Sequence, residues 1–334
     1  MKKIKIKFAS FWPSFNEEDN FIINTLKKHY EVELSDNPDY LFCSCFNNDF
    51  LKYDCVRIAY TGENWFPDFS YYDYAIGFEY LEYGDRYLRY PNWAIPELYK
   101  SDVELMQKKH EDIKENREKL LDRDFCTFVV SSGKGYVASN REDCFYKLSE
   151  YKKVASGGRY LNNIGKPEGV EDKLEFQSQH KFAIAFENTS MPGYSTEKIV
   201  QAFAAKTVPI YWGDTKIDEI FNPKAFIDAN KFANLDEVLA EVKRLDADDE
   251  AYINMLEERA LLDEATYKKY QSSLESFLTS IVDRDLEDAY RRDRKGYNKL
   301  KEDNFRELIY TSENTFSKKL RRCAGKIKHS IIKN

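Results

Sequence analysis

The clearest pattern of apolar and polar positions lies at residues 182–214, which read FAIAFENTSMPGYSTEKIVQAFAAKTVPIYWGD. Residues 182–186 form a short apolar run that stops at a polar bend, as is typical of a buried strand. Ser195 or Thr196 can cap the helix that follows, because the next apolar positions recur at helical spacing. A second apolar run occupies residues 208–212. The pattern predicts a strand, loop, helix and strand unit.

Similar alternation runs along most of the chain. Apolar runs predict strands at 3–8, 40–46, 55–60, 74–78 and 125–131, and helical periodicity predicts helices at 17–30, 101–124, 141–151, 171–180 and within 235–270. Strands that alternate with helices favour parallel sheets. We therefore expect an α/β protein with two parallel-sheet domains that face a cleft, at 1–121 and 122–283, followed by a tail at 284–334.

Composition narrows the class of protein. The chain has 334 residues, enough for two cores, and a net charge of −7, which disfavours a protein that binds nucleic acid over its whole surface. Six cysteines at 43, 45, 55, 126, 144 and 323 lack paired spacing, so neither a zinc site nor a disulfide framework is indicated. No stretch resembles a signal peptide or a membrane span, and we expect a cytosolic protein.

The bend after residues 182–186 is a candidate binding site. In parallel sheets this loop lies at the carboxyl end of a strand and beside a helix N-terminus, where anions bind favourably. Lys198 in the first helical turn opposes the helix dipole, so a bound phosphate would explain it better than helix stability does. The alternative is a solvated pair of Glu197 and Lys198 on a surface helix.

The segments FENT at 186–189, YSTEK at 194–198 and TVPIYWG at 207–213 resemble the donor signature of the α1,3/4-fucosyltransferases, glycosyltransferase family 10. Similarity to bacterial members extends upstream through YTGENWFPDF at 60–69 and YAIGFEYLEYGDRYLRYP at 74–91. The resemblance implies a GT-B fold, with an acceptor-binding domain at 1–121 and a GDP-fucose-binding domain at 122–283. It also implies an inverting transfer of L-fucose to the 3-hydroxyl of GlcNAc in N-acetyllactosamine-type glycans, as in Lewis antigens.

The resemblance also implies roles in donor binding. Arg141 matches the arginine that grips the donor phosphates, and a planar guanidinium suits that task. Asn188 matches a donor-binding asparagine, and Tyr194 matches a residue near the nucleotide. Glu197 matches an acid that faces fucose, and Lys198 matches a diphosphate cation. By its position alone, Arg141 could instead be an exposed helix residue.

Glu63 is the candidate general base for the acceptor hydroxyl. It lies in a turn directly after the strand that ends at Tyr60, and the resemblance places the catalytic glutamate at this position. Alternatively, Glu63 is a solvated loop carboxylate without a catalytic role. Glu79 and Glu82 are weaker candidates for the general base. His29, His110, His180 and His329 are expected to be structural or surface residues.

A metal ion is expected to be optional, because Arg141, Lys198 and a helix N-terminus can together neutralise the departing GDP. The Asp-x-Asp triplets at 122–124, 246–248 and 283–285 are interpreted as solvated charge on helices or linkers. We therefore predict no required cofactor and no metal site, with GDP-fucose and an oligosaccharide acceptor as the ligands.

The C-terminal segment is basic. Residues 291–334 contain 14 Lys and Arg against 5 Asp and Glu. The spacing at 316–334 favours an amphipathic helix that could contact an anionic membrane, although a solvated tail explains the same pattern. We expect a bacterial cytoplasmic enzyme with peripheral membrane contact through 316–334. A transferase for another nucleotide sugar and an inactive nucleotide- or glycan-binding protein are the alternatives, and the oligomeric state stays open.

Overall fold

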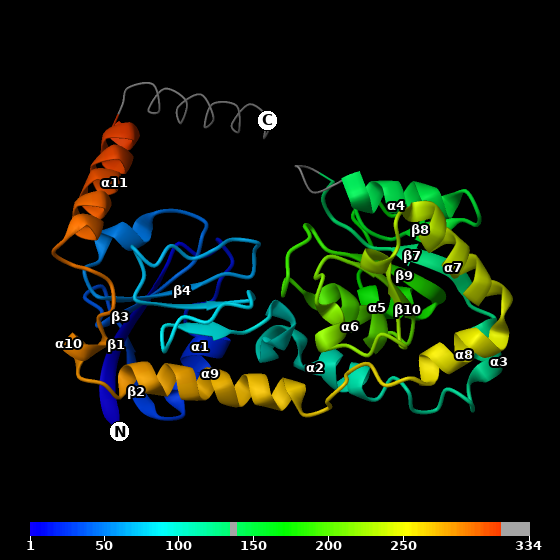
Figure 1. Ribbon diagram of the computed structural model, residues 1–334, viewed down its shortest axis with the longest axis horizontal. Helices are drawn as coiled ribbons and strands as arrows, with labels where there is room; N and C mark the ends of the chain where they lie inside the picture. The colour runs from blue at the N-terminus through cyan, green and yellow to red at the C-terminus, as the bar shows by residue number, and fades with distance from the viewer. Residues whose placement is uncertain (134–138, 315–334) are drawn as a thin grey trace, which may run out of the picture. The chain divides into compact units, whose positions relative to one another are not determined.

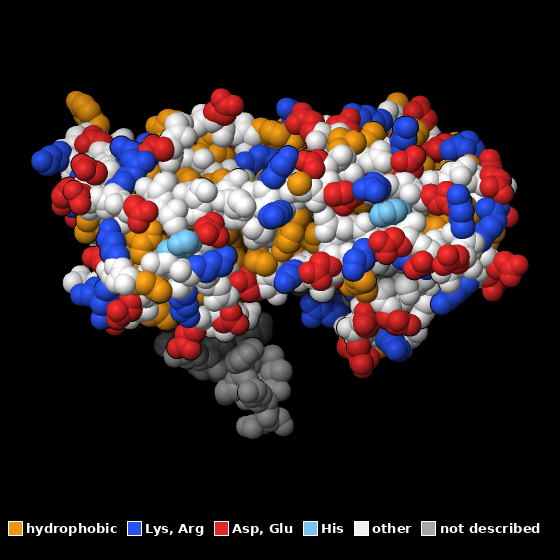
Figure 2. All heavy atoms as spheres, turned by 90° about the horizontal axis from the view of Figure 1, so that it is seen from below, with side chains coloured by type: hydrophobic (Ala, Val, Ile, Leu, Met, Phe, Trp, Pro, Cys, Tyr) orange, Lys and Arg blue, Asp and Glu red, His pale blue; other side chains and the backbone are white. Residues whose placement is uncertain are grey.

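The computed structural model describes residues 1–133 and 139–314, and Figure 1 shows its helices and strands. The chain divides into two compact units. The first comprises Met1–Gly77, Tyr83–Leu88 and the segment from Ser276 onward, and the second comprises Phe78–Glu82 and Arg89–Glu275. Acidic and basic side chains are mixed over the face shown in Figure 2.

The first unit is built on a six-stranded sheet. Its strand order is β2-β1-β3-β4-β5-β6. The strands are β1 (Lys2–Ala9), β2 (Tyr30–Leu34), β3 (Tyr40–Cys43), β4 (Val56–Tyr60), β5 (Tyr74–Gly77) and β6 (Tyr87–Arg89). The pairs β1/β2, β1/β3, β3/β4 and β4/β5 are parallel, with Phe8 opposite Phe42 and Ala59 opposite Ala75.

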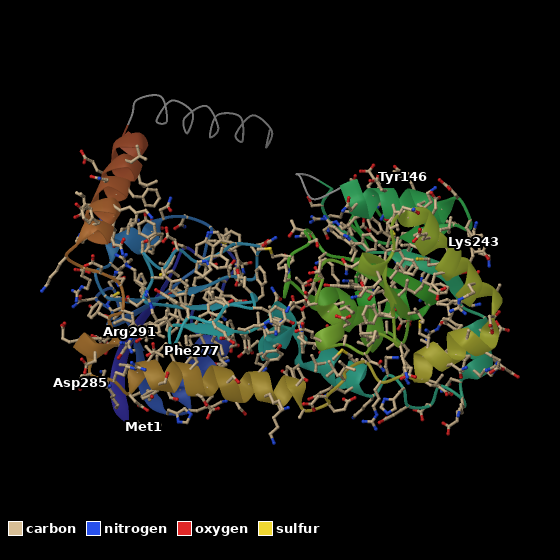
Figure 3. All side chains as sticks on the ribbon, in the orientation of Figure 1. Met1, Tyr146, Lys243, Phe277, Asp285 and Arg291 are labelled. Carbon is tan, nitrogen blue, oxygen red and sulfur yellow. The ribbon has the colours of Figure 1, made fainter. Side chains whose placement is uncertain are left out.

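Helices cover this sheet. They are α1 (Phe21–Lys27), the 3₁₀ turn η1 (Asp49–Lys52), α9 (Thr266–Val282), α10 (Leu286–Ala289) and α11 (Tyr297–Asn314). Helix α1 begins after Asn20, whose side chain accepts hydrogen bonds from the amides of Ile22 and Ile23, so it starts later than the predicted residue 17. Phe277 lies on the side of α9 that faces the sheet and packs edge-on against Tyr74 (Figure 3).

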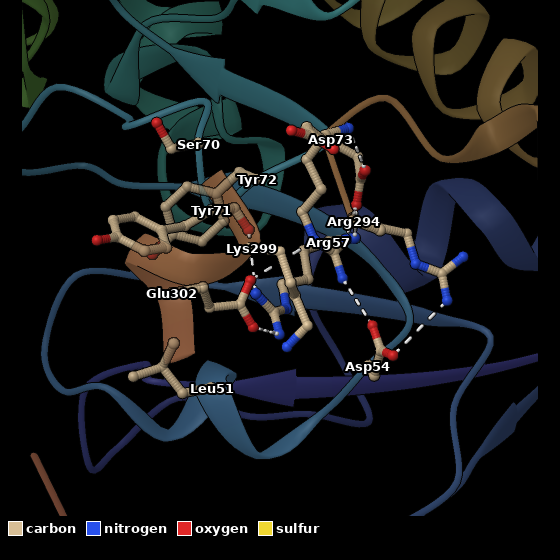
Figure 4. Close-up of polar contacts among 12 residues, drawn as sticks. Leu51, Asp54, Arg57, Ser70, Tyr71, Tyr72, Asp73, Arg294, Lys299 and Glu302 are labelled. Carbon is tan, nitrogen blue, oxygen red and sulfur yellow. Dashed lines mark hydrogen bonds and ion pairs between the residues drawn. The ribbon is translucent and has the colours of Figure 1, made fainter. Parts of the chain in front are cut away.

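Buried ion pairs hold the C-terminal segment on this unit. Arg57 in β4 is fully buried, and its guanidinium donates to Glu302 of α11 at 3.0 Å (Figure 4). Arg292 pairs with Asp73, and both side chains are almost fully buried. Residues 276–314 therefore complete the fold of the first unit rather than following the second unit as a separate tail.

The second unit contains a five-stranded parallel sheet in the order β11-β10-β9-β7-β8. The strands are β7 (Asp124–Phe128), β8 (Val154–Ser156), β9 (His180–Phe186), β10 (Val208–Trp212) and β11 (Ile227–Asp228). The two parallel sheets confirm the predicted α/β fold class. The strand predicted at 208–212 has the bounds that its apolar run indicates.

Helices flank this second sheet. They are α2 (Pro96–Gln107), α3 (Arg117–Leu121), α4 (Ser139–Ser149), α5 (Lys173–Ser178), α6 (Glu197–Ala204), α7 (Leu235–Ala247) and α8 (Asp249–Glu257), with 3₁₀ turns η2 (Asn92–Ala94), η3 (Ile217–Glu219) and η4 (Ala229–Lys231). The single helix predicted at 101–124 is wrong. It is split into α2 and α3 by turns, where Asp112 adopts the left-handed φ of 59° that a helix cannot continue through.

The compact units do not divide near residue 121, where the sequence predicts a boundary. Helix α2 packs against α6 in the second unit, and the chain returns to the first unit within α9. Of the predicted tail at 284–334, residues 284–314 include α10 and α11. The basic segment that was predicted to contact a membrane, 316–334, lies outside the described residues.

Candidate functional site

A pocket of about 410 Å³ lies at the carboxyl ends of β7 and β9 in the second unit. Residues 129–132 follow β7, Asn188 follows β9, and the other lining residues come from the beginnings of three helices. These are Arg141 of α4, Lys173 of α5, and Glu197 and Lys198 of α6. The parallel sheet therefore places the pocket where the sequence pattern predicts it.

Arg141 is buried, with 7% of its surface exposed, so the alternative of an exposed helix residue is wrong. Its Nη1 donates to Oδ1 of Asn188 at 3.0 Å, and its Nη2 lies 3.4 Å from the carbonyl of Ser132. Its Nε is buried and makes no hydrogen bond to the described residues. Burial lowers the pKa of the guanidinium from its usual value. Arg141 is thus held at the pocket with donor capacity left for a ligand.

Glu187 directly follows β9 and organises the start of α6. It is fully buried, and its two carboxylate oxygens accept hydrogen bonds at 2.7 Å from the amide and the hydroxyl of Thr196. Lys198 Nζ donates to Glu187 Oε2 at 2.9 Å. The prediction that a Ser195 or Thr196 side chain caps the helix is therefore wrong, because the Thr196 hydroxyl bonds to Glu187 instead. Thr196 is the N-cap residue, but its side chain makes no capping bond to the helix.

Charge coupling sets the ionisation of this cluster. Burial raises the pKa of Glu187, and Lys198 opposes that rise. Burial also favours neutral Glu197, but Lys198 and Lys173 outweigh it and lower its pKa. Burial disfavours charged Lys198, yet the two glutamates outweigh it and raise its pKa. Lys198 Nζ therefore lies between the carboxyl groups of Glu187 and Glu197, at 2.9 Å and 3.5 Å, and its charge favours their ionised forms.

Glycine is required behind Glu187. Gly213 has a φ of 151°, and a Cβ atom there would lie 2.6 Å or less from the Cβ and Cγ atoms of Glu187. Only glycine adopts this backbone conformation readily and leaves room for the carboxylate. The glycine that ends the signature segment therefore allows Glu187 to reach the start of α6.

Lys173 is a pocket residue that sequence reasoning missed. Its Nζ donates to Oε1 of Gln201 at 2.7 Å, and Gln201 Nε2 donates to Asp102 at 2.9 Å. Burial lowers the pKa of Lys173, against the raising effect of Glu197. Lys173 lies outside every recognised segment, so the only available signal was a lysine in the first turn of a predicted helix.

The remaining predicted residues lie elsewhere. Tyr194 is not among the described residues that line the pocket. It is 3% exposed, and its ring packs edge-on against Phe78 at 4.9 Å. Glu63 belongs to the first unit, where its side chain is exposed in the turn after β4 and its amide donates to Thr61 Oγ1 at 3.0 Å. The structure thus brings together Arg141, Asn188, Glu197 and Lys198.

The aspartate triplets have structural partners. Asp246 is almost fully buried and pairs with Lys152 and Lys181, which corrects its interpretation as solvated charge. Asp248 caps α8, and Asp283 accepts a hydrogen bond from Tyr30. Within the described ranges, no group of three or more His, Cys, Asp or Glu residues could hold a metal ion. Among these same residues, no helix has the length and apolar character that a membrane crossing requires.

Two family models match the chain. Residues 6–96 match the alpha-(1,3)-fucosyltransferase FucT N-terminal domain, and residues 121–301 match the C-terminal model of glycosyltransferase family 10 (fucosyltransferase). The second match alone covers more than half of the chain.

Individual relatives agree with these matches. The chain is 33% identical to an alpha-(1,3)-fucosyltransferase FucT of Helicobacter pylori over 77% of its own length and 60% of that protein's length. It is 41% identical to an Arabidopsis thaliana alpha-(1,4)-fucosyltransferase over 29% of each chain. The chain thus spans less than two thirds of the length of each of these relatives.

Solved structures are also similar. A crystal structure of alpha1,3-fucosyltransferase with GDP-fucose matches with a TM-score of 0.69 and 28% identity, over 83% of this chain and 91% of that one. Another crystal structure of alpha1,3-fucosyltransferase matches with a TM-score of 0.72 and 27% identity, over 88% and 93%. These matches confirm the family that the sequence motifs indicate: the chain is a member of glycosyltransferase family 10.

Proposed function

We propose that this protein transfers L-fucose from GDP-fucose to the 3-hydroxyl of GlcNAc in N-acetyllactosamine-type glycans. The observation that carries the proposal is the convergence of Arg141, Asn188, Glu197 and Lys198 on one pocket of the second unit. This pocket lies in a chain that is 28% identical to an alpha1,3-fucosyltransferase solved with GDP-fucose. The proposal assigns acceptor binding to residues 1–121 and GDP-fucose binding to residues 122–283.

The pocket suits a nucleoside diphosphate. Arg141 and Lys198 face it from the first turns of two helices, and Lys173 adds a third cation. Guanidinium and ammonium groups stabilise phosphate oxygens, and a helix N-terminus adds favourable partial charge. As GDP leaves, its growing negative charge would meet these groups, which are already in place. Because these protein groups can neutralise the departing GDP, we predict that transfer of fucose does not require a metal ion.

Three further residues have distinct proposed roles in donor binding. Glu197 lines the pocket, and its lowered pKa favours the carboxylate form. The carboxylate oxygens can accept hydrogen bonds from the hydroxyl groups of fucose. Asn188 orients Arg141 and offers its amide to the donor. Tyr194 is proposed to support the nucleotide side of the site from its buried position.

Glu63 is the proposed general base. An exposed carboxylate directly after β4 can accept a proton from the acceptor hydroxyl as that oxygen attacks C1 of fucose. The bond between C1 and the GDP oxygen breaks in the same displacement, which inverts the β-linked donor into an α-fucoside. We also propose that the enzyme is cytoplasmic and that residues 316–334 contact the membrane surface.

The decisive experiment measures GDP release from GDP-fucose, with GDP-mannose and UDP-galactose as controls, with and without N-acetyllactosamine. A chelator is present in a parallel series. Release from GDP-fucose that requires the acceptor and survives the chelator is the expected result. Release from another donor would indicate a different sugar transferase, whereas GDP binding without turnover would indicate an inactive binding protein.

A further inference from the structure

A second pocket lies in the first unit, at the carboxyl end of β1. It has a volume of about 270 Å³, and its lining includes Ser10, Phe11, Trp12 and Phe15. The strand order β2-β1-β3 makes β1 the point where successive strands are added on opposite sides. Ligands of open α/β sheets bind at such switch points, outside the carboxyl ends of the strands. The topology therefore marks this pocket as a binding position.

Ser10 is strained and unsatisfied. Its φ is 63°, its side chain is 4% exposed, and its Oγ has no hydrogen-bond partner among the described residues. Its carbonyl accepts the amide of Phe46 at 3.0 Å, which holds the loop in place. A non-glycine residue in this conformation is strained, and such strain clusters at ligand sites. Ser10 thus offers a buried hydroxyl that no neighbour uses.

Aromatic rings form one wall of the pocket. Phe11 and Phe15 stack with centroids 4.0 Å apart, and Trp12 lies edge-on to Phe15 at 5.0 Å. Trp12 also packs edge-on against Phe46, which is 48% exposed. Half-buried rings beside polar groups suit a ligand with an apolar face and hydroxyl edges.

The charges in the lining argue against an anionic ligand, and Glu17 adds a carboxylate to that lining. Lys7 donates to Asp36 at 2.8 Å, and Lys52 pairs with Asp49. Because the pocket's lysines are already paired, an anion would gain little from them. A neutral polyhydroxylated ring fits the aromatic wall, the free Ser10 hydroxyl and these mixed polar groups together.

Contacts connect this pocket to the loop of Glu63. Phe11 stacks with Tyr60, the last residue of β4, at 6.3 Å. Thr61 contacts Cys45 Sγ at 3.2 Å and accepts the amide of Glu63 at 3.0 Å. Strands β1, β3 and β4 are neighbours, so their ends span roughly 10 Å, two strand spacings.

We propose that the pocket of Ser10 and Trp12 binds the neutral pyranose unit next to the one that receives fucose. Trp12 stacks on the face of this sugar, and Ser10 hydrogen-bonds one of its hydroxyls. The inference rests on the proposed function, which supplies a glycan acceptor near Glu63, and it names the residues that anchor that acceptor.

The test compares Trp12→Ala, Trp12→Phe and Ser10→Ala with the wild type. Trp12→Ala should raise the KM for N-acetyllactosamine about tenfold, because the substitution removes the aromatic face against which the sugar packs. Trp12→Phe should restore most of the affinity, and Ser10→Ala should raise KM less than Trp12→Ala. Affinity for GDP should not change, because the proposed GDP pocket lies in the second unit. Circular dichroism and urea unfolding report whether the first unit of each variant is folded. Tyr297→Ala, at a 90% exposed ring of the same unit, is the control with unchanged activity.

Saturation-transfer NMR with N-acetyllactosamine separates the subsite from the reaction. Sugar signals that disappear in Trp12→Ala would support the subsite even if the wild type transfers no fucose, in which case only the proposed function fails. Equal acceptor KM and equal NMR signals in all variants would overturn the subsite. Competition by inorganic phosphate at this pocket would also overturn it, because the ligand would then be an anion.

Discussion

Lys198 Nζ lies 2.9 Å from Oε2 of Glu187, a carboxylate with no solvent exposure. This pair changes the interpretation of the signature helix. A lysine in the first turn is unfavourable for the helix dipole, but here a buried acid compensates its charge from below while its ammonium group still lines the pocket. Glu187 therefore acts as a positioning residue for the proposed phosphate-binding lysine.

Glu187→Gln should lower both stability and donor affinity. The amide keeps the volume of the side chain but removes the charge that holds Lys198, and hydrogen bonds to charged groups contribute about 1.5–3 kcal/mol. Urea unfolding and GDP titration calorimetry measure the two effects. Glu175→Gln, at an exposed position of α5, is the control. An unchanged urea midpoint in Glu187→Gln would contradict the structural role of the pair.

Arg141→Lys should weaken GDP binding by roughly tenfold to a hundredfold. Lysine keeps the charge but loses the planar fork that can bind phosphate while contacting Asn188. Equilibrium titration with GDP gives the dissociation constant. Arg244→Lys, on the exposed face of α7, should bind GDP like the wild type. Equal GDP affinity in Arg141→Lys would remove Arg141 from the phosphate site.

Glu63→Gln should reduce fucose transfer by roughly a hundredfold to ten-thousandfold, the usual contribution of a general base. GDP affinity should stay the same, because the proposed base acts on the acceptor. Steady-state kinetics with saturating N-acetyllactosamine provide the measurement, and Glu31→Gln, at an exposed position of β2 in the same unit, serves as the matched glutamate control. Normal turnover in Glu63→Gln would exclude this residue as the base.

Glu302→Ala should destabilise the first unit by about 3–5 kcal/mol. The substitution leaves the guanidinium of Arg57 buried without its carboxylate, and an unpaired buried charge is costly. Chemical denaturation gives the loss. Glu307→Ala, at an exposed position of the same helix, should leave the unfolding curve unchanged. Equal curves for both variants would show that α11 contributes little to this unit.

Lys109 should make stability depend on pH. Burial lowers the pKa of its ammonium group from 10.5 to about 7 in the folded chain. Between these values the unfolded state binds more protons, so the free energy of unfolding should rise as pH increases above about 7. The limiting slope is about 1.4 kcal/mol per pH unit.

The difference in unfolding free energy between wild type and Lys109→Met isolates this contribution from all other titrating groups. Between pH 7 and 9, the unfolding free energy of the wild type should increase relative to that of Lys109→Met. A difference that does not vary with pH would mean that Lys109 remains charged in the folded state. Lys109 donates to the carbonyl of Leu256 at 2.9 Å, so Lys109→Met also loses a fixed, pH-independent contribution.

Local sequence determined much of the second unit. The apolar run at 208–212 is a strand with the same bounds, and the loop after β9 leads into a helix at Glu197, as helical spacing indicates. Motif spacing also identified the family and four residues that line one pocket. These features depend on interactions between residues close in the chain, so periodicity and motif spacing report them.

Tertiary structure decided the remainder. Glu187 is only a polar residue after a strand until the fold places it beneath Lys198, and Lys173 gains its position from the packing of α5 beside α6. Arg57 and Glu302 are separated by 245 positions, and no local pattern relates them. Such pairs depend on where distant segments meet in the folded chain and on the cost of leaving a buried charge unpaired. The sequence by itself therefore determined many of the elements, the family and most of the proposed donor pocket, whereas tertiary packing decided which charges are buried and paired.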